Sequence, residues 1–185
     1  MQFSLEQQET LLNIARDAIR RTLSREPLIS PSIEPGLDLN AGCFVTLHER
    51  GTHRLRGCIG RMRSEEPLAK TVQDLAADVL QDPRFGDWRV QLDDLANIDI
   101  DLSVLSPPVP AESPLDFEPL VQGIYLTIGN RTGCFLPQVA RETGWTREQL
   151  LARLCSEKMG LSPTAWQGGG KLETFTATII GPVPF

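Results

Sequence analysis

The chain has 185 residues, of which 41% are hydrophobic and 23% charged, and its formal net charge is −6. This length suits one domain with a proper core or two closely packed subdomains. The acidic balance argues against non-specific nucleic-acid binding, which requires excess lysine and arginine to neutralise phosphates. No apolar run approaches the ~20 residues needed to cross a bilayer, and the N-terminal residues lack the basic and apolar regions of a secretion signal.

The cysteines do not suggest a metal or redox centre. They stand at positions 43, 58, 134 and 155, without the Cys-X-X-Cys spacing of zinc knuckles and redox motifs. We therefore expect a cytoplasmic protein with reduced thiols, no cofactor and no membrane association.

The first elements in the chain are a helix and a hairpin. Ser4 and Gln7 form a capping box for a helix over residues 5–23, with apolar side chains at helical spacing. Residues 26–41 hold three prolines and one glycine and predict an irregular segment. Residues 41–60 then read as a β-hairpin.

The expected register of this hairpin brings two cysteines together. Residues 43–48 pair with residues 53–59 across a turn at 49–52, which places Cys43 directly opposite Cys58, with Cβ atoms roughly 4.5–5.5 Å apart. Alternation along the second strand puts Arg54, Arg56 and Cys58 on one face. A bulge at Gly57 would break this alternation.

The rest of the chain alternates helices with strands. Pro67 opens a second helix that ends near residue 81 because Pro83 disfavours helical geometry before it. The remaining predictions are a strand at 98–104, a surface excursion at 107–119, a hairpin at 123–128 and 131–136, a helix from Thr146 to Gly160, and a strand at 171–180. With no repeated βαβ unit, we expect an α+β fold with a mainly antiparallel sheet and flanking helices.

Residues 55–60, Leu-Arg-Gly-Cys-Ile-Gly, are the strongest candidate for a site. A nearby guanidinium favours thiolate over thiol, which makes Cys58 a candidate catalytic nucleophile. Arg56 could clamp an anion, while Gly57 and Gly60 leave the backbone open to a ligand. The simpler alternative is that Cys58 is a small buried hydrophobe and the glycines mark a bulge.

Other polar residues allow both a chemical and a structural interpretation. His48 and His53 lack the further ligands that a metal site needs, and neither is placed by local geometry to act as a base for Cys58. Asp82 and Arg84 follow the second helix and either pair structurally, which is the interpretation we favour, or bring an acid and a base to the edge of the hairpin. Gln138 follows a predicted strand exit and is free to hydrogen-bond backbone groups.

Five segments together resemble the AMMECR domain family, also called AmmeMemoRadiSam system protein A. The similar motifs are residues 55–60, Asp-Pro-Arg-Phe at 82–85, Asp-Leu-Ser-Val-Leu-Ser-Pro at 101–107, Gly-Cys-Phe-Leu-Pro-Gln-Val at 133–139, and Leu-Cys-Ser-Glu-Lys-Met-Gly-Leu at 154–161. One departure is Gln122, where many relatives carry histidine. The resemblance implies a single AMMECR-like domain over residues 1–185 with a larger and a smaller subdomain, the smaller within roughly 60–100. It also implies a Memo-like protein and a radical SAM enzyme as partners, but it supplies no reaction.

Three functions therefore remain open from the sequence. The chain binds a small or anionic ligand or a partner at residues 55–60, with Arg56, Gly57, Cys58, Gly60, Asp82, Arg84 and Gln138 as binding candidates. Alternatively it is a thiol-dependent enzyme that uses Cys58, or a non-catalytic interaction scaffold. The oligomeric state is not predicted.

Overall fold

The computed structural model describes residues 1–185 and shows an α+β fold with two four-stranded sheets, which confirms the predicted class. Its contacts divide the chain into two compact units. Unit 1 comprises Met1–Leu105 and Thr178–Phe185, and unit 2 comprises Ser106–Ala177. Residues 60–100, given above as the range of a smaller subdomain, lie within unit 1.

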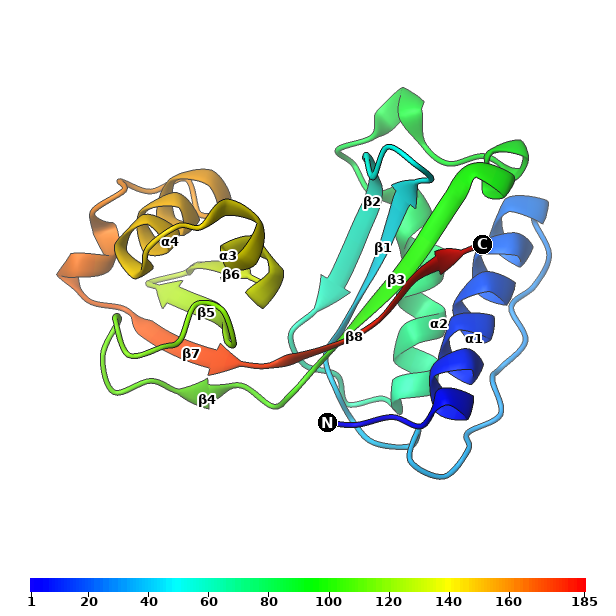
Figure 1. The fold of residues 1–185 in the computed structure, drawn as a ribbon, viewed down its shortest axis with the longest axis horizontal. Coiled ribbons are helices and arrows are strands. Elements are labelled where there is room, and N and C mark those ends of the chain that lie inside the picture. The colour runs from blue at the N-terminus through cyan, green and yellow to red at the C-terminus, as the bar shows by residue number, and fades with distance from the viewer. The chain divides into compact units, whose positions relative to one another are not determined.

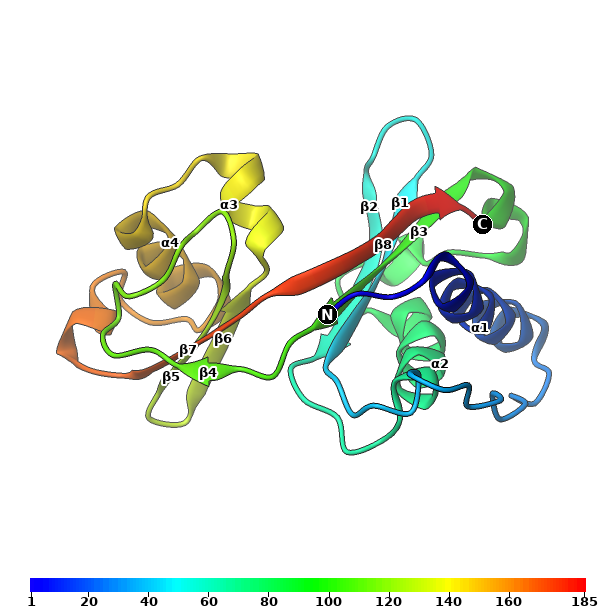
Figure 2. The same cartoon turned by 60° about the horizontal axis from the view of Figure 1, so that its bottom comes forward.

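Unit 1 is a sheet covered on one face by two helices. The strands are β1 (Cys43–Glu49), β2 (Leu55–Arg61), β3 (Ile98–Leu105) and β8 (Ala177–Pro184), in the order β2-β1-β3-β8. Helices α1 (Leu5–Ser24) and α2 (Leu68–Asp78) lie against the same face of this sheet (Figures 1 and 2). The alternating apolar residues of β1 and β3 point to these helices and form the core with them.

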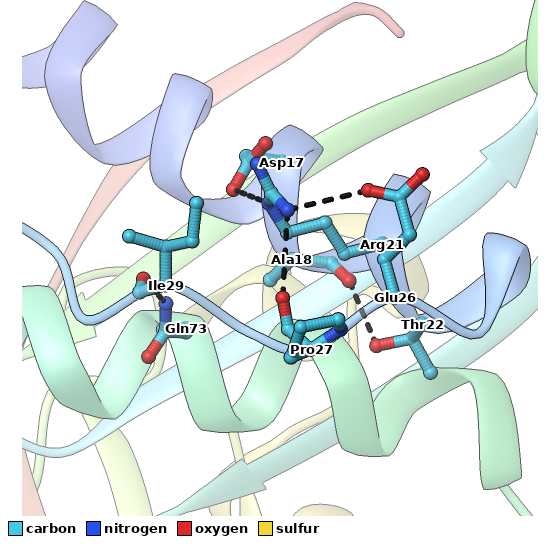
Figure 3. Close-up of polar contacts among 8 residues, drawn as sticks. All are labelled: Asp17, Ala18, Arg21, Thr22, Glu26, Pro27, Ile29 and Gln73. Carbon is cyan, nitrogen blue, oxygen red and sulfur yellow. Dashed lines mark hydrogen bonds and ion pairs between the residues drawn. The ribbon is translucent and has the colours of Figure 1, made fainter.

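Helix α1 begins where its sequence predicts. The Ser4 side chain accepts a hydrogen bond from the Gln7 amide, and the Gln7 side chain returns one to the Ser4 amide, which completes the predicted capping box. Figure 3 shows how the chain after α1 is held: Arg21 contacts Asp17, Glu26 and the Pro27 carbonyl.

The irregular segment after α1 is also fixed to α2. The Gln73 side-chain amide donates to the Ile29 carbonyl at 2.6 Å, as the same close-up shows (Figure 3). Gln73 is buried although it is polar, and this bond satisfies its amide nitrogen. The segment is therefore irregular in backbone but tied to both helices.

Helix α2 leads into the motif at residues 82–85. It continues as a 3₁₀ turn, η1 (Val79–Gln81), and ends at Gln81, two residues before Pro83, as predicted. Two further 3₁₀ turns, η2 (Gly86–Trp88) and η3 (Leu92–Asn97), connect to β3. Asp82 is thus the first residue beyond the helix, at the side of the sheet where β2 lies.

Unit 2 has its own sheet and its own core. Strands β4 (Val109–Pro110), β5 (Gly123–Ile128), β6 (Arg131–Phe135) and β7 (Lys171–Phe175) are arranged in the order β4-β7-β5-β6. Its helical elements are α3 (Pro137–Thr143), α4 (Arg147–Arg153), the π-helical turn η4 (Leu154–Lys158) and the 3₁₀ turn η5 (Ala165–Gly168). Side chains from β5, α4 and η4 form the second core.

Two elements of unit 2 differ from the sequence prediction. Residues 137–143 form helix α3, where a strand exit was expected, because Pro137 suits the first turn of a helix. The strand predicted at 171–180 is divided near Thr176 into β7 and β8, which belong to different sheets.

The predicted register of the first hairpin is wrong. Cys43 pairs with Arg61, and Cys58 lies opposite Thr46. Leu47 pairs with Gly57 while His48 pairs with Leu55, so Arg56 is the extra residue of a β-bulge. The bulge lies one residue before the expected position, and it removes Arg56 from the alternation that was to place it beside Cys58.

No helix in the structure is both long enough and apolar enough to span a membrane.

Candidate functional site

Cys58 lies on β2, an edge strand of the larger sheet, and its backbone is held from outside the sheet. Its amide donates to Asp82 Oδ2 at 3.0 Å, and its carbonyl accepts from Arg84 Nη2 at 2.8 Å. An exposed edge strand normally presents such groups to solvent or to another strand. Asp82 and Arg84 therefore satisfy the backbone amide and carbonyl that Cys58 would otherwise expose at the edge of the sheet.

Asp82 is the buried centre of this arrangement. It is 1% exposed and also accepts hydrogen bonds from the Arg84 backbone amide and guanidinium, the shortest at 2.6 Å. Burial by itself would raise the pKa of Asp82. The hydrogen bonds from Arg84 and from the Cys58 amide outweigh burial and lower this pKa below its ordinary value. Asp82 is thus an anion that accepts hydrogen bonds, not an acid ready to release a proton.

The Cys58 side chain is on the sheet face opposite the helices, which we call the second face. Thr46 on β1 lies between Cys58 on β2 and Asp101 on β3, since it pairs with both. The Thr46 hydroxyl donates to Cys58 Sγ at 3.5 Å. Cys58 is half-buried, whereas Thr46 and Asp101 are both buried.

This environment keeps the thiol protonated. Burial is the largest influence and raises the pKa of Cys58 above its ordinary value of 9.0. The Thr46 hydrogen bond and the Arg84 charge act in the opposite direction but are outweighed, and Asp101 and Asp82 add to the increase. The sequence-based expectation of an activated thiolate is not supported.

A histidine–carboxylate pair lies beside the thiol on the second face. His48 Nε2 is 3.0 Å from Asp101 Oδ2, and His48 Nδ1 is 3.3 Å from the His53 carbonyl oxygen. Both ring nitrogens therefore face oxygen atoms that can accept a hydrogen bond. The second face thus combines a thiol, a hydroxyl, a carboxylate and an imidazole on adjacent strands.

Arg56 is directed away from the thiol. Its guanidinium Nη2 lies 3.2 Å from Asp94 Oδ2 and donates to the Trp88 carbonyl at 3.3 Å. Its Nε is buried without a hydrogen-bond partner. Arg54 stacks on the Trp88 ring, with 4.6 Å from Cζ to the ring centroid. An anion bound by Arg56 would have to compete with Asp94.

The two glycines beside Cys58 have packing roles. A Cβ at Gly57 would lie 3.0 Å from the Val79 side chain and carbonyl, so Gly57 allows β2 to approach η1. A Cβ at Gly60 would lie 2.2 Å from the Phe44 ring, which covers this glycine on the second face. Both glycines thus allow close packing. The simpler sequence interpretation took them as marks of a bulge, but the bulge lies at Arg56.

The structure brings together only some of the predicted residues. Asp82, Arg84 and Cys58 form one hydrogen-bonded group, while Gln138 lies in unit 2 on α3. Sequence reasoning missed Thr46, His48 and Asp101 as neighbours of the thiol. The polar alternation along β1 and β3 was visible, but their adjacency depends on a strand order that the sequence does not state.

The cysteines and acidic residues do not assemble into a metal centre. No group of three or more histidine, cysteine, aspartate or glutamate side chains is arranged to hold a metal ion. None of the four cysteines forms a disulfide, and Cys43 is buried on the helix-covered face of the sheet.

Comparison with known proteins shows similarity along both units. A family model described as AMMECR1 matches residues 12–180. Protein PF1979 of Pyrococcus furiosus is 38% identical over 184 residues, covering 93% of this chain and 86% of the relative. Protein MJ0810 of Methanocaldococcus jannaschii is 32% identical over 188 residues, covering 97% and 92%. The crystal structure of the uncharacterized protein PH0010 from Pyrococcus horikoshii has a TM-score of 0.82 and 35% identity, covering 91% of this chain and 88% of that one.

Proposed function

Because the chain belongs to the AMMECR1 family, we propose that it is a binding protein whose ligand or partner contacts the second face at Cys58, and that it acts with a Memo-like protein and a radical SAM enzyme. The partners follow from the family resemblance. The position of the contact follows from the arrangement around Cys58. Binding is favoured over catalysis because the thiol is not activated.

The observation that carries the proposal is the double anchoring of one half-buried cysteine. Burying a carboxylate is costly unless it is paired and hydrogen-bonded, yet Asp82 is almost fully buried to hold the Cys58 amide and Arg84. These hydrogen bonds fix the backbone of Cys58, whose side chain lies on the second face. Rigid support of this kind is what a binding site requires of the residues behind it.

The groups beside Cys58 indicate the kind of ligand that binds there. A protonated thiol is a weak donor, Asp101 is an acceptor already paired with His48, and Thr46 has its hydrogen directed at sulfur. Arg84 is the nearby cation, with its side chain 49% exposed. A small polar group that accepts hydrogen bonds from the thiol and from Arg84 would fit these neighbours, whereas Asp82 and Asp101 oppose a full negative charge at the sulfur.

The test compares variants of the second face in direct binding. The chain is mixed with the purified Memo-like and radical SAM proteins of its own host, and dissociation constants are measured by titration calorimetry. Cys58→Ser and Thr46→Val should weaken the interaction at least tenfold. Cys134→Ser is the matched control, because Cys134 is another half-buried cysteine but lies in unit 2.

A second measurement covers a small-molecule ligand. Native mass spectrometry of protein purified gently from its host should show a bound species that the Cys58→Ser variant lacks. The proposal fails if neither partner binds and no species co-purifies, or if all three variants bind as the wild type does.

A further inference from the structure

Unit 2 contains a cavity that is separate from Cys58. Its volume is about 480 Å³, within the range of roughly 300–1,000 Å³ that small-molecule sites occupy. One wall is Trp166 and Gln167 of η5 with the glycines that follow them, and the other is residues 113–115. All of these residues belong to unit 2.

The cavity is lined by one aromatic side chain and by uncharged polar and apolar residues, and none of its lining side chains is charged. Trp166 is held in place, since its ring packs against the second core and its backbone amide hydrogen-bonds the Cys155 thiol. Ser113 and Gln167 are both exposed, and neither the hydroxyl of Ser113 nor the side-chain amide of Gln167 is hydrogen-bonded to another residue. These groups can therefore bond a ligand that lies on the indole.

The glycine run after Trp166 keeps one wall open. A Cβ at Gly168 would meet no atom within 4 Å, and the backbone of Gly168 is not in the left-handed region, so neither packing nor conformation requires glycine there. Gly169 has φ +110°, which does favour glycine. Gly170 is needed for packing, since its Cβ would lie 3.1 Å from the Thr127 carbonyl. The exposed backbone of residues 168–169 is thus accessible without a side chain in front of it.

We infer that this cavity binds an uncharged, planar heterocycle with amide-like donors and acceptors, of the class to which free nucleobases belong, stacked on Trp166. A flat ring suits an aromatic wall, because offset stacking is favourable for such pairs. The amide of Gln167 and the hydroxyl of Ser113 then pair with the polar edge of the ring. The lack of a basic side chain in the lining argues against a nucleotide, whose phosphate would need one.

The experiment uses the full chain and the three indole N–H signals of its tryptophans. Adenine, uracil and nicotinamide are titrated separately while ¹⁵N–¹H spectra are recorded, with signals assigned by single Trp→Phe variants. For at least one probe the Trp166 signal should shift in a saturable manner, while those of Trp88 and Trp145 remain fixed. Trp166→Ala should weaken binding about tenfold or more, and Trp166→Phe should retain most of it.

A second variant keeps the inference testable if Trp166→Ala unfolds the small core. Gln167 is exposed and makes no internal side-chain bond, so Gln167→Leu should fold normally and weaken binding severalfold. Trp88→Phe, in unit 1, is the control and should bind as the wild type does. The inference is overturned if no probe shifts the Trp166 signal at millimolar concentration, or if all three indole signals shift together. It is also overturned if a probe binds the wild type and Gln167→Leu with the same affinity.

Discussion

Replacing Asp82 by asparagine tests the proposed anchoring of Cys58. Asp82 accepts hydrogen bonds from the Cys58 amide at 3.0 Å, from the Arg84 amide at 3.1 Å, and from Arg84 Nε and Nη2 at 3.0 and 2.6 Å. Asparagine keeps the shape of the side chain. It offers only one carbonyl oxygen, however, and turns an NH₂ group toward donors.

The expected loss of stability in Asp82→Asn follows from the unequal exposure of the Asp82 and Arg84 side chains. Removing one member of a buried ion pair costs roughly 3–5 kcal/mol when the other charge stays buried. Here Asp82 is buried but half of the Arg84 side chain is exposed, so the guanidinium regains water in the variant. We therefore expect Asp82→Asn to lower the free energy of unfolding by about 2 kcal/mol, near the value of one or two hydrogen bonds to a charged group.

The pH dependence has a defined sign. The folded-state pKa of Asp82 is lowered from its ordinary value of 3.8, so its charge stabilises the folded state above that pH. This stabilisation is lost as the pH falls through the lowered pKa. The difference between wild type and Asp82→Asn should therefore be full at neutral pH and should shrink below about pH 4.

The assay is urea unfolding followed by circular dichroism at 222 nm. This signal reports mainly on unit 1, because α1 and α2 are the longest helices of the chain. Asp78→Asn is the matched control: Asp78 ends the same helix, but its side chain is 62% exposed and it lies 3.9 Å from Arg61. The reasoning is refuted if both variants lose the same stability, or if the Asp82→Asn difference persists unchanged at pH 3.

Two further predictions concern the same strand. Gly60→Ala should lower the free energy of unfolding by roughly 1–3 kcal/mol, because the added Cβ overlaps the Phe44 ring. Adding Phe44→Leu to this variant should recover part of the loss, while the control Gly168→Ala should change stability by less than about 0.5 kcal/mol. Equal unfolding midpoints for the two alanine variants would contradict this prediction. The rate at which iodoacetamide alkylates Cys58 should keep rising through pH 9, because burial raises the pKa of this thiol. Cys155 should stay unmodified in the folded protein, because it is fully buried. A rate for Cys58 that levels off near pH 7 would instead support a thiol-dependent enzyme.

Elements with strong local signals could be predicted from the sequence. The capping boxes at Ser4 and Thr146 mark the beginnings of α1 and α4 correctly, since each cap satisfies backbone donors within a few residues. The alternation of β3 and the turn between β5 and β6 were equally local. The fold class followed from the order of these elements without knowledge of any long-range contact.

The candidate site could be predicted only in part. Asp82 and Arg84 were named, and a structural pairing was favoured for them, but that they hold Cys58 could not be read from residues more than twenty positions away. The role of Arg56 was missed because one bulge residue reverses the face of every side chain before it. Neither error could be corrected locally, since hairpin register depends here on how β2 meets β1 and η1.

The bulge at Arg56 explains how residues 55–60 direct Arg56 to η2 and η3 and Cys58 to the second face. The extra residue lets Arg56 reach Asp94 and the Trp88 carbonyl, which fixes the connection between η2 and η3. Beyond the bulge, Gly57 packs on η1 and Cys58 turns to the second face, where its backbone is held by Asp82 and Arg84. An arginine two residues from a cysteine thus does not by itself indicate an activated thiol, because backbone geometry between them decides whether the charge reaches the sulfur. In this chain the nearby cation is Arg84, and its influence on the thiol is smaller than that of burial.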